Sequence, residues 1–122
     1  MLYYVAAVLL IFIGVAHSYL GERYILIRLF RRGNLPKLFG GEAFTQNTLR
    51  FAWHLTTIAW WGFAAILIYL AEQALHLQTL AMIIAVTFLL HAVISLVGGR
   101  GKHFSWLIFS AIAACLLLAS NR

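Results

Sequence analysis

The stretch from Phe51 to Ala71, FAWHLTTIAWWGFAAILIYLA, has 21 residues and no Asp, Glu, Lys or Arg. At a helical rise of about 1.5 Å per residue, it can cross the roughly 30 Å hydrocarbon core of a bilayer. Further apolar segments lie at about 2–20, 79–97 and 104–120. The chain is 64% hydrophobic and 10% charged, which excludes an ordinary soluble domain and predicts an integral membrane protein.

We therefore expect an all-α fold with one domain over residues 1–122. It is predicted to be a four-transmembrane-helix antiparallel bundle with a short basic amphipathic extension after the first helix. In this extension apolar residues recur at helical spacing opposite four arginines: Ile25, Leu26, Leu29 and Phe30 against Arg23, Arg28, Arg31 and Arg32. The extension is predicted either to continue the first helix or to lie along the membrane interface.

Basic residues are unevenly distributed among the predicted loops. Eight of the nine Lys and Arg residues lie in the loops after the first and third segments, and the loop after the second segment holds none. The positive-inside rule then places both basic loops in the cytoplasm and both termini outside, as in a bacterial inner-membrane protein with periplasmic termini. The net charge of +6 is attributed to contact with anionic lipid headgroups, and no nucleic-acid partner is expected.

Each predicted segment carries one histidine in its cytoplasmic half: His17, His54, His91 and His103. Ionisable side chains are costly in hydrocarbon unless they face a partner or a cavity, so we expect these rings to point into the bundle.

Small and polar residues share helix faces with these histidines. The stripes comprise Gly14, His17, Gly21, Ser18 and Glu22 on the first segment, Arg50, His54, Thr57 and Trp61 on the second, and Thr87, His91 and Ser95 on the third. Together they predict a single polar site inside the bundle.

Imidazole is the commonest protein ligand for transition metals. We therefore predict that His17, His54 and His91 bind one centre, either a Zn, Cu or Fe ion or a b-type haem. His103 and Glu22 are second-rank ligands. Glu22 could instead orient one imidazole as a hydrogen-bond acceptor, and each histidine could simply bond across helices.

His54 and Trp61, seven residues apart on an apolar helix, resemble the second-helix pattern of the copper-resistance D proteins and of the bacterial membrane protoporphyrinogen oxidases. The resemblance is confined to this segment, and the rest of the chain does not follow those families. It implies copper or haem as the cofactor and adds Trp61 to the candidate cofactor-binding residues.

Three functions remain open at this point. The first is a small membrane protein whose histidine cluster performs redox or metal-dependent chemistry. The second is an accessory or assembly subunit without a cofactor, which would need a membrane protein partner or a second copy of the chain. The third is a small transporter or proton-coupled carrier. The sequence predicts no catalytic residue.

Overall fold

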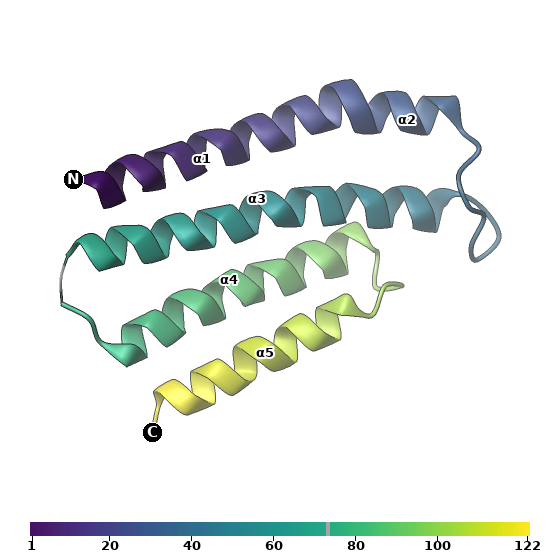
Figure 1. Ribbon diagram of the computed structural model, residues 1–122. Helices are drawn as coiled ribbons and strands as arrows, with labels where there is room; N and C mark the ends of the chain where they lie inside the picture. The colour runs from purple at the N-terminus through teal and green to yellow at the C-terminus, as the bar shows by residue number, and fades with distance from the viewer. Residues whose placement is uncertain (73) are drawn as a thin grey trace.

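The computed structural model describes residues 1–72 and 74–122, and no strand occurs within them (Figure 1). The helices are α1 (Leu2–Leu20), η1 (Gly21–Leu26), α2 (Ile27–Arg32), α3 (Ala43–Ala71), α4 (Leu77–Gly98) and α5 (Ser105–Ser120). The long helices run antiparallel to their neighbours. Both termini therefore lie at one end, and the α2–α3 connection and the α4–α5 turn lie at the other. The predicted all-α fold is confirmed.

The basic extension continues the first helix. Residues Leu2–Arg32 form one helical run of 31 residues, in which η1 is a π-helical turn. π-Helical turns are rare and occur most often at functional sites. The run stops where Gly33 and Asn34 adopt positive φ angles of 74° and 60°, a conformation that an α-helix cannot continue.

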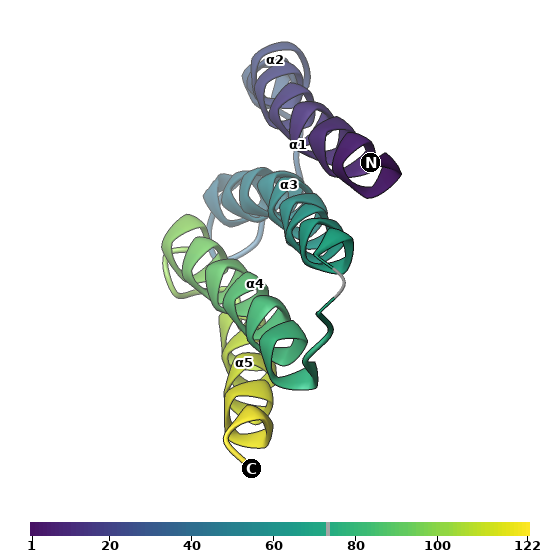
Figure 2. The same ribbon diagram turned by 90° about the vertical axis from the view of Figure 1, so that its left-hand side faces the viewer.

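The four long helices form an open, row-like bundle (Figure 2). Within the part of the chain that the structure describes, the extensive packing joins α1 to α3, α3 to α4 and α4 to α5. The buried hydrophobic residues are few and mostly small: Ala7, Leu26, Phe51, Ala64, Ala85, Ala92 and Ala113. Small side chains let helix backbones approach closely, which is how membrane helices commonly associate.

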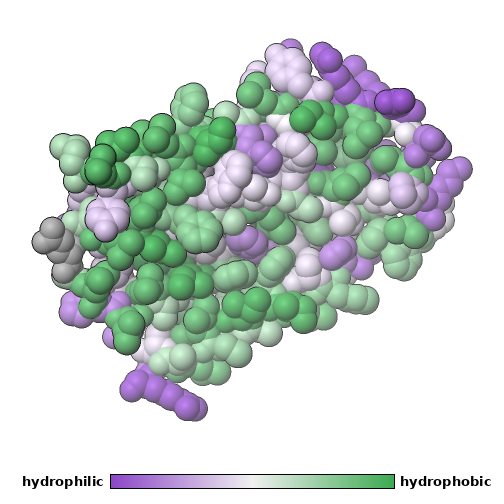
Figure 3. Space-filling view, viewed as in Figure 1, coloured by the Kyte–Doolittle hydropathy of each residue, from purple (hydrophilic) through white to green (hydrophobic). Residues whose placement is uncertain are grey.

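Three helical runs are long and apolar enough to cross a membrane: Leu2–Arg32, Ala43–Ala71 and Leu77–Gly98. The second begins at Ala43, before the predicted span of 51–71. α5 has 16 residues, which extend about 24 Å, so a fourth crossing stays a prediction. Figure 3 shows an apolar face with hydrophilic side chains gathered at the end that holds α2 and the connections. By length and composition, the chain is suited to a membrane.

Candidate functional site

The polar stripes of α1–η1 and α3 face each other and form a chain of hydrogen bonds. The hydroxyl oxygens of Ser18 and Thr57 are 2.5 Å apart, and Thr57 Oγ1 is 3.1 Å from the carbonyl oxygen of Gly14. Nδ1 of His54 is 2.9 Å from Ser18 Oγ, and its Nε2 is 3.0 Å from Glu22 Oε2. The connection from Glu22 to the Gly14 carbonyl is therefore continuous.

Glu22 has a second partner on α3. Arg50 Nη2 lies 2.8 Å from Glu22 Oε1, and the guanidinium carbon lies 4.9 Å from the centre of the Phe30 ring. The side chains of Glu22 and His54 are 29% and 30% exposed. Three ionisable groups thus meet in a partly buried position where η1 packs on α3.

The direction of each hydrogen bond in this chain can be assigned from its carbonyl end. A carbonyl oxygen cannot donate, so Thr57 donates to Gly14 and its own oxygen accepts from Ser18. Because Ser18 has donated its single proton, its oxygen must accept from Nδ1–H of His54. His54 Nε2 and the Glu22 carboxylate would then both be acceptors, unless one proton lies between them.

One proton between Glu22 and His54 completes this network. The pair is then either an imidazolium with a carboxylate or an imidazole with a carboxylic acid, and Arg50 supplies a positive charge to the other carboxyl oxygen. Without the proton, the Nε2 lone pair would face a carboxylate oxygen, and the contact would be repulsive. All four contacts are therefore hydrogen bonds at the same time only when one proton lies between Glu22 and His54.

His17 lies in the same interface, but it pairs with Trp53. The two rings stack with centroids 4.6 Å apart, His17 Nε2 donates to the Trp53 carbonyl oxygen at 3.2 Å, and Trp53 Nε1 donates to the His17 carbonyl oxygen at 2.9 Å. A Cβ on Gly21 would collide with the same indole ring. His17 therefore joins α1 to α3 by packing and backbone hydrogen bonds.

His91 lies in a different interface, on the face of α4 that meets α3. It is buried, its Nδ1 donates to the carbonyl oxygen of Thr87 at 2.8 Å, and its ring centre is 5.2 Å from that of Phe109 on α5. In the predicted stripe of α4, His91 and Ser95 are therefore buried and Thr87 is half-buried.

The remaining predicted residues, His103 and Trp61, have partners outside the Glu22–His54 pair. His103 pairs with Ser105 through Nδ1 and Oγ at 2.9 Å, beyond the end of α4. Trp61 donates from Nε1 to the carbonyl oxygen of Ile11 at 3.3 Å, and a Cβ on Gly14 would collide with its indole. Trp61 is thus a contact between α1 and α3.

The predicted single metal centre finds no support in this arrangement. Residues 1–72 and 74–122 contain no group of three or more His, Cys, Asp or Glu side chains that could hold a metal ion. His54 is bonded to Ser18 and Glu22 of the first helical run, whereas His91 is bonded to the carbonyl oxygen of Thr87 on its own helix, so the two imidazoles share no partner. The other role considered for Glu22, acceptance from an imidazole, matches its contact with His54.

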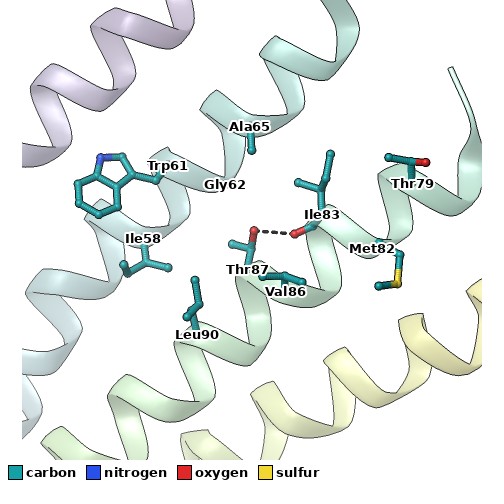
Figure 4. Close-up of a pocket in the computed structure, with 10 residues that line it drawn as sticks. All are labelled: Ile58, Trp61, Gly62, Ala65, Thr79, Met82, Ile83, Val86, Thr87 and Leu90. Carbon is teal, nitrogen blue, oxygen red and sulfur yellow. Dashed lines mark hydrogen bonds between the residues drawn. The ribbon is translucent and has the colours of Figure 1, made fainter. Parts of the chain in front are cut away.

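A groove of about 370 Å³ lies between α3 and α4 (Figure 4). Its walls are largely apolar, with Ile58 and Trp61 contributed by α3 and Val86 and Leu90 by α4. The hydroxyl of Thr87 is engaged with the carbonyl oxygen of Ile83 at 2.8 Å. The residues that line this groove include no ionisable side chain. The groove therefore suits an apolar ligand, and it cannot exchange protons as the α1–α3 network can.

Ser18, Thr57 and Arg50 belong to the site but were not among the predicted site residues. The sequence could have identified them, because they lie on the same helix stripes as His54 and Glu22. Comparison with protein-family models, curated proteins and solved structures finds no match to this chain. Its function is therefore inferred from the geometry of the site.

Proposed function

We propose that this protein is a small proton-coupled membrane carrier in which the Glu22–His54 pair binds and releases the proton. The observation that carries the proposal is the directed hydrogen-bond chain, which is complete only when one proton lies between these two side chains. Ionisable residues inside membrane helices commonly mark proton relays. Release of the proton would break a contact that joins η1 to α3, so protonation and helix packing are coupled.

The hydroxyl groups extend this pair along the helix. From Glu22 to Gly14 the chain covers about 12 Å at the helical rise, and it ends at the Gly14 carbonyl oxygen, which only accepts. Rotation of the Ser18 and Thr57 hydroxyls would reverse the direction of their bonds, so the hydroxyls can follow a change in the protonation of His54. This supports a carrier more directly than it supports an accessory subunit.

The proton-binding role predicts a specific result for Glu22→Gln. The amide of the glutamine donates to neutral His54 Nε2 while its carbonyl oxygen accepts from Arg50, so the network is complete without the extra proton. When the pH is lowered, the original chain in nanodiscs should take up about one proton per molecule more than the variant does. A pH-indicator dye measures this uptake. At any pH at which His54 is charged in the original chain, histidine ¹⁵N spectra should show it neutral in the variant.

Glu72→Gln is the matched control, because that carboxylate pairs with Tyr4 at the opposite end of the molecule. It should leave the proton uptake associated with His54 unchanged. Equal uptake by the Glu22→Gln variant and the original chain would contradict the proposal.

We further propose that the protein resides in a bacterial inner membrane with both termini in the periplasm. The support is that the basic loops lie at the end opposite the termini, where they would meet the anionic headgroups of the cytoplasmic leaflet. Alkaline phosphatase fused after Arg122 should be active, and the same enzyme inserted at Gly40 should be inactive. The reverse pattern would contradict this orientation.

The transition metal or haem b cofactor stays a prediction. Elemental analysis and absorbance near the Soret band of the purified protein test it directly, and the proton-coupled function requires neither.

A further inference from the structure

A second polar group lies in the α3–α4 interface, apart from the α1–α3 network. His91 is only 7% exposed, and its Nδ1 lies 2.8 Å from the carbonyl oxygen of Thr87. Because a carbonyl can only accept, Nδ1 carries the proton, and Nε2 of the neutral ring is an acceptor. Among residues 1–72 and 74–122, no donor is bonded to Nε2.

His91 lines a cavity of about 230 Å³ between the two helices. On the α3 side, Ala59 and Gly62 keep the wall shallow, and aromatic surface is provided by Phe63 of α3 and Phe88 of α4. The cavity is smaller than the roughly 300–1,000 Å³ of sites for drug-sized ligands, so it admits one ring and not a macrocycle. Its remaining walls are aliphatic, and its surroundings are helices suited to a membrane.

We propose that this cavity binds a hydroquinone-type head group, whose phenolic hydroxyl donates to Nε2 of His91. The Nε2 acceptor has no donor bonded to it in this largely apolar cavity, and a ligand hydroxyl supplies one. The aromatic walls match a flat ring, because aromatic pairs pack well when offset or edge to face. An apolar substituent on the ring would remain among the aliphatic side chains, so the ligand reaches the cavity from the hydrocarbon. The inference does not depend on Glu22 or His54.

The test compares a decyl-substituted hydroquinone with its dimethyl ether, using the full chain in nanodiscs. The ether has the same ring and tail but cannot donate. The hydroquinone should bind about tenfold more tightly, as expected for one hydrogen bond, and it should shift the ¹⁵N resonance of His91 Nε2. His91→Phe keeps an aromatic ring without the acceptor, and it should lower hydroquinone affinity to that of the ether. His103→Phe is the matched control and should leave both affinities unchanged.

Equal binding of the hydroquinone and the ether to the original chain would overturn the proposal, and so would binding of neither. A ligand-induced shift at His54 with none at His91 would place the ligand elsewhere and would also overturn it. The comparison of the two ligands is made on the unaltered protein, so it decides the question even if the His91→Phe variant does not fold.

Discussion

Replacing Glu22 with leucine is expected to lower the free energy of unfolding by about 2–3 kcal/mol. The substitution leaves Arg50 and His54 without their shared acceptor in a partly buried position. Removal of one partner from a fully buried ion pair costs about 3–5 kcal/mol, and the partial exposure of these side chains reduces that figure. Reversible unfolding in mixed detergent micelles, followed by circular dichroism, measures the change.

Two further variants separate the ion pair from simple packing. Glu22→Gln should cost less than about 1 kcal/mol, because its amide can satisfy both neighbours. In the Glu22→Leu, His54→Leu double variant, the loss should be smaller than the sum of the two single losses, since the two residues interact directly. Additive losses would mean that the 3.0 Å contact between Glu22 and His54 contributes nothing to stability.

The second large effect is expected for Gly21→Ala, which should destabilise the protein by about 1–3 kcal/mol, as overpacking of an interior does. A Cβ at this position would lie inside the indole ring of Trp53, so η1 and α3 would have to separate. That separation would also lengthen the contact between Glu22 and His54. The same unfolding measurement, together with the proton uptake of the variant, tests both consequences.

Gly41→Ala is the control for this substitution, because a Cβ there meets no atom within 4 Å. Its effect should stay within about 0.5 kcal/mol. In a Trp53→Ala background, Gly21→Ala should cost less than it does in the original chain, since the indole is the group that the new methyl displaces. An equal cost in both backgrounds would indicate that the π-helical turn itself, and not the contact with Trp53, requires glycine.

The helices themselves could be predicted from the sequence, because long uncharged apolar runs have few alternatives to helical structure. The stripes also indicated which sides of α1 and α3 are buried. Gly14, Ser18 and Thr57 meet across that interface because residues three, four and seven apart share a helix face.

The location of Glu22 was harder to predict. It was placed on the polar stripe of the first segment, either as a second-rank metal ligand or as an acceptor from one imidazole, and the structure shows the contact with His54. The predicted span of 2–20 ended before Glu22, whereas the helix continues through it as a π-helical turn. The π-helical turn begins at Gly21, against which Trp53 packs, and this tertiary contact is not encoded in any local pattern.

The order of the helices in space could not be predicted either. Helical periodicity shows which residues share a face but not which face meets which neighbour. His54 and His91 were expected to converge, and the open row places them in different interfaces.

The row also divides the chain into two antiparallel hairpins, one made by α1 to α3 and the other by α4 and α5. The proton network lies wholly within the first hairpin, whereas the 370 Å³ groove and the 230 Å³ cavity lie at the seam between the two. Sliding of one hairpin on the other would alter those spaces without stretching any bond of the network. The proton network and the seam meet at a third groove. Arg50 and His54 line one of its walls, and Val93 and Val97 line the other. At that position, the charge on the first hairpin borders directly on the seam.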